Sequence, residues 1–252
     1  MIFLHGSFAD LRFWDGVRET AAAEHRFIAY TRRAYGTGAW PEPPNGETGR
    51  VAQVADLVAL IKAWGGPASL VGVGNSGQVA LMAAAEAPDL VRAVVLFEPT
   101  LLPLLWGASG PEGGAEIADA YDMALEDALA AEDPEAAMRQ VYEFLYGLPK
   151  GGFDGLDPGF RAMALELAPH LAAEGGSPGP SLISCGALGR VQAPVLLVVA
   201  GDSRSVWALG AEAAAECLPH ATLETVAGVG HDWPIADGPA FARTVLDFID
   251  RQ

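Results

Sequence analysis

The feature that most constrains this chain is an alternation of short apolar runs with longer, alanine-rich amphipathic stretches. It is typical of a parallel β-sheet covered by helices, because parallel strands are joined by helical crossovers and are buried on both faces. The predicted strands are residues 2–4, 27–30, 69–73, 93–97, 194–200 and 222–226. The clearest predicted helices are residues 50–64, 78–87 and 239–250, in which apolar side chains recur at helical spacing. The sequence therefore predicts an α/β fold.

The segment between the fourth and fifth predicted strands breaks this rhythm. It contains three helix-like stretches, at 115–130, 135–145 and 160–173, separated by clusters of glycine and proline, and no apolar run typical of a buried strand. A helical excursion at this point is typical of a cap over the carboxyl edge of the sheet, where open α/β sheets bind their ligands. We therefore predict a core formed by residues 1–98 and 190–252, and a helical cap over 99–189.

Charge and cysteine content limit the possible partners. With 15 basic and 32 acidic residues among 252, the formal net charge of −17 would repel nucleic acids and anionic membrane surfaces. We therefore expect a neutral, apolar or cationic ligand, and a protein that is a monomer or homodimer. Because no signal-like or membrane-spanning stretch is evident, we expect a cytoplasmic protein. Cys185 and Cys217 lack metal-ligand spacing, so they are predicted to be reduced, buried thiols, with no metal or cofactor.

Five short motifs follow one another in a recognisable order. They are Leu4-His5-Gly6-Ser7 with Phe13-Trp14, the turn Arg33-Ala34-Tyr35-Gly36, the stretch Gly72-Val73-Gly74-Asn75-Ser76-Gly77, the strand 194–201, and the loop Gly228-Val229-Gly230-His231. In this order, and over nearly the whole chain outside the cap, they resemble the α/β-hydrolase superfamily. The resemblance implies an oxyanion loop, a nucleophile elbow, an acid loop and a loop with a catalytic histidine. The family has two further strands before the first one here, so we expect a truncated start or a smaller sheet.

The elbow motif can be aligned in two registers. A nucleophile elbow needs small residues two positions before and two after the nucleophile, because the strand-to-helix turn is strained and crowded. One register places Gly74 at the nucleophile position, and the other places Ser76 there but puts the bulky Gln78 where a small residue is required. The interval from Gly74 to Pro88 favours the first register. We therefore predict that Ser76 lies in the first turn of the following helix and that the nucleophile is absent.

The acid of the triad is also displaced. The resemblance places it three residues after Gly201, where this chain has Arg204, which cannot orient an imidazolium as a carboxylate does. Two alternatives remain open for the partner of His231: Asp202, which follows Gly201 directly, and Glu98, at the end of the strand 93–97.

An oxyanion hole needs only backbone amides, so it survives changes of side chain. The resemblance assigns these donors to Ser7 and Asn75, and each such donor contributes a factor of roughly 10² to 10³ in rate. Large aromatic residues in the same loops predict an apolar pocket for a bulky ligand. The candidate substrate-binding residues are Phe8, Trp40, Trp106, Trp207 and Trp233.

A site with an oxyanion hole and a base but no nucleophile is suited to forming an enolate. The sequence therefore predicts an enzyme that moves a proton next to a carbonyl group, as an epimerase, isomerase or cyclase, on a bulky natural-product or modified-peptide substrate. Atypical members of the superfamily that lack the nucleophile do such work, and the chain resembles the bottromycin type of peptide epimerase. The alternatives are a serine hydrolase that uses Ser76 and a non-catalytic protein that binds a small molecule.

Overall fold

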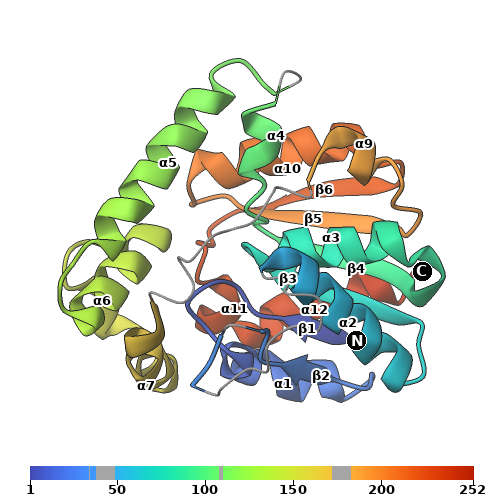
Figure 1. Ribbon diagram of the computed structural model, residues 1–252. Helices are drawn as coiled ribbons and strands as arrows, with labels where there is room; N and C mark the ends of the chain where they lie inside the picture. The colour runs from blue at the N-terminus through green and yellow to red at the C-terminus, as the bar shows by residue number, and fades with distance from the viewer. Residues whose placement is uncertain (34, 38–48, 108–109, 172–182) are drawn as a thin grey trace.

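The computed structural model describes residues 1–33, 35–37, 49–107, 110–171 and 183–252. Six parallel strands form one sheet in the order β2-β1-β3-β4-β5-β6 (Figure 1). The strands are β1 Ile2–Leu4, β2 Ile28–Tyr30, β3 Ala68–Val73, β4 Val91–Phe97, β5 Val195–Ala200 and β6 Ala221–Val226. All six predicted strands are present, with ends that differ by at most two residues, and the predicted α/β fold with a parallel sheet is confirmed.

Helices cover both faces of this sheet. The helices are α1 Asp15–Ala22, α2 Arg50–Ala63, α3 Ser76–Glu86, α4 Leu102–Leu105, α5 Gly114–Leu129, α6 Pro134–Leu145, α7 Pro158–Leu167, α9 Cys185–Leu188, α10 Ser205–Cys217, α11 Trp233–Ala236 and α12 Gly238–Ile249. Alternate strand residues point to opposite faces, so Phe3 and Val71 pack toward α1 and α12, whereas Leu4 and Leu70 pack toward α2 and α3. The two resulting apolar cores enclose β1 and β3 almost completely.

The segment between β4 and β5 is helical where it is described, from α4 to α9 (Figure 1). In that figure α5, α6 and α7 lie together at one side of the sheet, and α5 also packs against α10. The helix predicted over 160–173 begins earlier, at Pro158, and ends at Leu167, where a short 3-10 turn over Ala168–His170 follows. Pro169 lies in this turn and has no amide hydrogen to continue the α-helical hydrogen bonds. The assignment of 99–189 as a separate cap domain stays a prediction.

The prediction of two reduced, buried thiols is wrong. Cys185 and Cys217 form a disulfide, their Cα atoms lie 4.9 Å apart, and Cys185 is exposed. The two residues are 32 positions apart in the sequence, and only the packing of α9 on α10 brings them together. Within the described ranges, no helix is both long and apolar enough to cross a membrane.

The order of the strands determines where a ligand can bind. The chain passes from β1 outward to β2, and the next strand, β3, pairs on the other side of β1. The loops after β1 and β3 therefore diverge toward opposite faces of the sheet and leave a crevice at their carboxyl ends. The oxyanion-loop and elbow motifs are the segments that follow these two strands.

Candidate functional site

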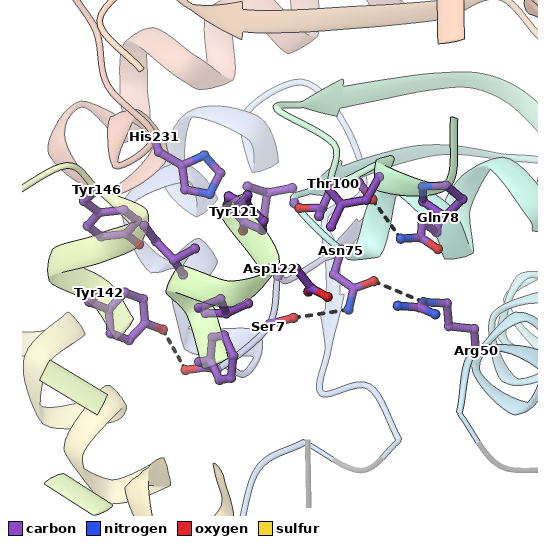
Figure 2. Close-up of a pocket in the computed structure, with 18 of the residues that line it drawn as sticks. Ser7, Arg50, Asn75, Gln78, Thr100, Tyr121, Asp122, Tyr142, Tyr146 and His231 are labelled. Atoms are coloured by element: carbon purple, nitrogen blue, oxygen red, sulfur yellow. Dashed lines mark hydrogen bonds between the residues drawn. The ribbon is translucent and has the colours of Figure 1, made fainter. Parts of the chain in front are cut away.

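A cavity of about 330 Å³ lies at this crevice, between the loops of the sheet and the helices α5 and α6 (Figure 2). Gly6, Ser7 and Phe8 line it from the loop after β1, and Gly74 and Asn75 line it from the loop after β3. His231 lines it from the loop after β6. The fold thus brings together three motifs that are far apart in the sequence.

Gly74 occupies the apex of the turn between β3 and α3. Its φ of +56° lies in the left-handed region, and its amide donates to Phe97 O at 3.1 Å. A Cβ atom built on it would meet only Thr100 Oγ1, at 3.7 Å. The turn therefore has the shape of a nucleophile elbow and lacks a side chain at the position from which a nucleophile would attack.

Ser76 is the first residue of α3 and is fully buried. Its Oγ donates within 2.8 Å of Leu4 O and accepts the amide of Val73 at 2.9 Å. Ser76 is not among the residues that line the cavity. This placement agrees with the predicted register, in which Ser76 lies in the first turn of the helix. The structure adds that the hydroxyl links β1 and β3 through hydrogen bonds.

His231 is bound to Glu98. The imidazole Nδ1 donates to Glu98 Oε2 at 2.6 Å, across 133 positions of sequence. Because Nδ1–H faces a carboxylate, the neutral ring carries its lone pair on Nε2, and no described residue forms a hydrogen bond with that atom. The pair therefore has the arrangement of a general base oriented by an acid.

Further hydrogen bonds hold the carboxylate of Glu98 in its position beside His231. It is fully buried, and its carboxylate also accepts the amide of Ala200 at 3.2 Å and the hydroxyl of Ser203 at 3.0 Å. Its φ of +43° is uncommon for a residue with a side chain, and such strain concentrates at functional sites.

Asp202, the alternative partner, is exposed and forms no hydrogen bond with His231. The prediction that Asp202 contributes to the site is therefore wrong. Its amide donates to Val229 O at 3.1 Å, which ties the backbone of this turn to the histidine loop. The end of β4, which carries Glu98, lies beside the end of β5 because these two strands pair, whereas the Asp202 side chain leaves the sheet edge toward solvent.

The predicted oxyanion donors lie at the same cavity. The amides of Ser7 and Asn75 donate no hydrogen bond to another described residue. The two side chains fix the loops relative to each other, since Asn75 Nδ2 donates to Ser7 Oγ at 3.2 Å. On the other side, Arg50 Nε donates to Asn75 Oδ1 at 3.3 Å (Figure 2). Two backbone amides are thus available to a carbonyl oxygen.

Phe8 lies next to these amides and lines the cavity, and its predicted role in binding substrate stays a prediction. Its φ of +60° is a strained conformation for a bulky residue. The hydroxyl of Tyr142 on α6 donates to Phe8 O at 2.6 Å. The cap helix therefore stabilises the strained oxyanion loop directly.

The four predicted tryptophans have different positions. Trp106 lines the cavity, and its indole donates to Asp119. Trp207 and Trp233 do not line it, so the prediction that they bind substrate is wrong. Both are buried, because Trp207 stacks on His231 and Trp233 packs edge-on against Phe97. Trp40 lies outside the described residues.

Side chains that carry no motif complete the cavity. From the cap come Tyr121 and Asp122 of α5, and Tyr146 just after α6. Burial raises the pKa of Tyr121 and of Tyr146 above the ordinary phenol value, so both stay protonated and can donate. Arg50 of α2 is the cation of the cavity, and burial lowers its pKa. The helical spacing of Tyr121, Asp122 and Leu125 was the available sequence signal for this face.

His5 braces the loop after β1 by hydrogen bonds and does not line the cavity. It is buried, Nδ1 donates to Gly6 O at 2.8 Å, and Nε2 accepts the amide of Arg32 at 3.0 Å. No cluster of three or more histidine, cysteine, aspartate or glutamate side chains suited to a metal ion occurs within the described residues.

The comparisons place the chain in a family. Residues 1–244 match the model of the alpha/beta hydrolase family, and the chain belongs to that family. It is similar to an enol-lactonase from Burkholderia xenovorans LB400, with 18% identity, 99% of this chain and 90% of that chain covered, and a TM-score of 0.74. It is also similar to a thermophilic esterase from Thermogutta terrifontis, with 20% identity, coverage of 99% and 89%, and a TM-score of 0.74.

A third similar structure is a bromoperoxidase from Bacillus anthracis, with 17% identity, coverage of 99% and 91%, and a TM-score of 0.76. At these identities the likeness shows the shared fold. The resemblance to peptide epimerases stays a prediction.

Proposed function

We propose that this protein catalyses proton transfer at a carbon next to a carbonyl group, as an epimerase, isomerase or cyclase. The observation that carries the proposal is a combination. His231 with Glu98 and the amides of Ser7 and Asn75 face one cavity, whereas Gly74 stands where a nucleophile would be. The site thus retains the groups that handle protons and negative charge and lacks the group that forms a covalent acyl intermediate.

The proposed step is balanced within these groups. His231 Nε2 takes the proton from the carbon next to the carbonyl. The electron pair of the broken C–H bond forms the carbon–carbon double bond of the enolate, and the π pair of the carbonyl moves to its oxygen. The amides of Ser7 and Asn75 stabilise the enolate oxygen, and Glu98 stabilises the imidazolium. The imidazolium of His231 then returns a proton, exchanged with solvent, to the enolate. Delivery to another carbon gives the isomer, and delivery to the other face of the same carbon, after the enolate has turned in the cavity, gives the epimer.

The substrate is proposed to be a bulky natural product or modified peptide that inserts one unit into the cavity. A volume of about 330 Å³ is at the lower end of ligand pockets, and its lining is mainly apolar, with Phe8 and Leu102 as examples. A larger molecule would extend past Trp106, which is 44% exposed at the rim.

Hydrolysis is the second candidate, because two of the similar structures are an enol-lactonase and an esterase. The hydroxyl of Ser76 is buried and takes part in two hydrogen bonds, which disfavours a mechanism with Ser76 as the nucleophile. Hydrolysis would instead need His231 to activate water directly. This candidate predicts a product that gains the elements of water and no deuterium at carbon.

The test is hydrogen exchange in deuterated water. Phenyl-substituted alkyl ketones such as 4-phenyl-2-butanone, and N-acyl phenylalanine esters, are incubated with the protein and followed by proton NMR. We expect loss of the signal of the proton next to the carbonyl with the wild type and with His220→Ala, whose histidine is exposed, and its retention with His231→Ala. Absence of exchange with every probe that binds would refute the proposal and favour a ligand-binding protein.

A further inference from the structure

We propose that Asp122 makes the site selective for carbonyl compounds that carry a cationic amino group close to the carbonyl. This inference names the substrate class for the site of the proposed function and rests on it for the reaction. The recognition itself can be measured without turnover.

Asp122 lies on the cap helix α5 and lines the cavity. Figure 2 shows its carboxyl group turned toward the part of the cavity where Asn75 and Ser7 lie. The side chain is half-buried and has neither a hydrogen bond nor an ion pair with any residue that the structure describes. Two other acidic side chains near the site are engaged: Glu98 binds His231, and Asp119 accepts the indole N–H of Trp106. Asp122 is thus a carboxylate available to a ligand.

The carboxylate of Asp122 faces the same space as the two oxyanion amides, and an ammonium group on the ligand would offset the unfavourable effect of its negative charge there. The amides of Ser7 and Asn75 favour negative charge on a carbonyl oxygen, and a carboxylate facing the same space disfavours it. The side chain of Arg50 is the cation of the cavity, and its Nε is directed at Asn75 Oδ1, at 3.3 Å. A positive group on the substrate, between the carbonyl and Asp122, would satisfy the carboxylate and offset the charge of the enolate.

The neighbouring groups fit this assignment. Tyr121 adjoins Asp122 on the same helix, and burial keeps its phenol protonated, so no second anion competes there. The formal net charge of −17 raises the local concentration of cations over anions. An ammonium group next to the reacting carbon also makes its C–H bond more acidic, because the positive charge stabilises the carbanion that forms. The same group would therefore serve both binding and proton removal.

The test compares three probes of nearly equal size. Phenylalaninamide carries the ammonium group at pH 6.5, 3-phenylpropanamide lacks it, and 3-phenylpropanoate is an anion. Dissociation constants are measured by calorimetry or ligand-observed NMR for the wild type, Asp122→Asn and Asp127→Asn. Asp127 lies on the same helix and is exposed, so its variant is the matched control.

We expect the wild type and Asp127→Asn to bind phenylalaninamide most tightly. Asp122→Asn should lose at least about tenfold in affinity for this cation, which is the size of a charge-assisted hydrogen bond, and bind 3-phenylpropanamide unchanged. Equal loss for both amides, or tightest binding of 3-phenylpropanoate by the wild type, would overturn the proposal. Failure of the proposed function has a different signature, because the binding preference would remain while the α-proton of phenylalaninamide failed to exchange in deuterated water.

Discussion

The indole of Trp207 lies parallel to the imidazole of His231, with ring centroids 3.9 Å apart and planes at 1° to each other. Phe97 also packs near the imidazole, with ring centroids 5.9 Å apart and planes at 19°. The indole is itself fixed, because it is buried and its Nε1 donates to Thr100 Oγ1 at 3.4 Å. The ring of His231 is therefore packed by two aromatic rings, and its hydrogen bond to Glu98 sets its rotation.

Trp207→Leu should reduce proton exchange at the site, because the indole no longer restrains the imidazole of His231. It should also change the NMR shifts of the His231 ring protons, because the ring current of the stacked indole is lost. Trp233→Leu is the control, since Trp233 is equally buried but packs on Phe97 and Phe241 instead of His231. Both variants should be destabilised by a few kcal/mol, about the usual cost of truncating a core aromatic. Equal effects of both on the His231 ring shifts would contradict a positioning role of Trp207.

Glu98→Gln should lower the exchange rate by about 10² or more, because an amide cannot stabilise the imidazolium and can present the wrong partner to Nδ1. The measurement is the rate of deuterium uptake by a probe that the wild type exchanges. Asp202→Asn should leave that rate unchanged, since Asp202 is exposed and away from the cavity. A larger loss of the exchange rate with Asp202→Asn than with Glu98→Gln would instead identify Asp202 as the acid that partners His231.

Ser76→Ala should affect stability more than activity. Removal of the buried hydroxyl leaves the amide of Val73 without its acceptor, at a cost of about 1–3 kcal/mol in the free energy of unfolding. Urea unfolding measures this cost, and deuterium uptake should be little changed. In a triad enzyme, loss of the nucleophile lowers turnover by about 10⁶, so a collapse of activity without loss of stability would point to a serine hydrolase.

Gly74→Ser should introduce esterase activity. The turn already has the left-handed backbone of an elbow, and a Cβ atom there meets only an ordinary contact with Thr100. The variant should hydrolyse p-nitrophenyl acetate and react with a serine-directed phosphonate. Gly74→Ala has the same backbone strain, about 1–2 kcal/mol, and should show neither activity. Activity that persists in the double variant with His231→Ala would show that the serine does not use the His231 base.

His5 should make the fold sensitive to mild acid. Burial, and then the charge of Arg32, lower its pKa well below 6.5. His5 in the unfolded chain therefore binds a proton near pH 6.5, whereas His5 in the folded chain stays neutral at that pH. The contribution of His5 to the free energy of unfolding is thus complete above pH 6.5 and is lost as the pH falls below it. The free energy of unfolding should decrease by at most about 1.4 kcal/mol per pH unit for this group.

His5→Gln should show a smaller decrease in the free energy of unfolding between pH 7 and pH 5, whatever its stability at pH 7. His220→Ala is the control, because His220 is exposed, and should keep the full slope. An unchanged slope in His5→Gln would assign the acid sensitivity to other groups.

Local sequence patterns were sufficient for the elements and for the elbow. The strands and the bounds of five of the six predicted helices, all within two residues, follow from apolar periodicity, which depends on neighbours within one or two turns. The position of Gly74 follows in the same way, because the elbow is a turn of five residues with its own steric requirements. These features are properties of short segments, so the chain specifies them without reference to its distant parts.

Only the tertiary structure decided which segments meet. Glu98 and Asp202 are equally plausible partners of His231 in the sequence, and the pairing of β4 with β5 selects Glu98. The disulfide between Cys185 and Cys217 and the burial of Trp207 depend in the same way on how α9 and α10 pack. Asp122 carries no motif, and its exposure to the cavity arises only when α5 packs beside the sheet. The physical reason is that side-chain direction and long-range contact are set by the packing of whole elements, which local periodicity does not encode.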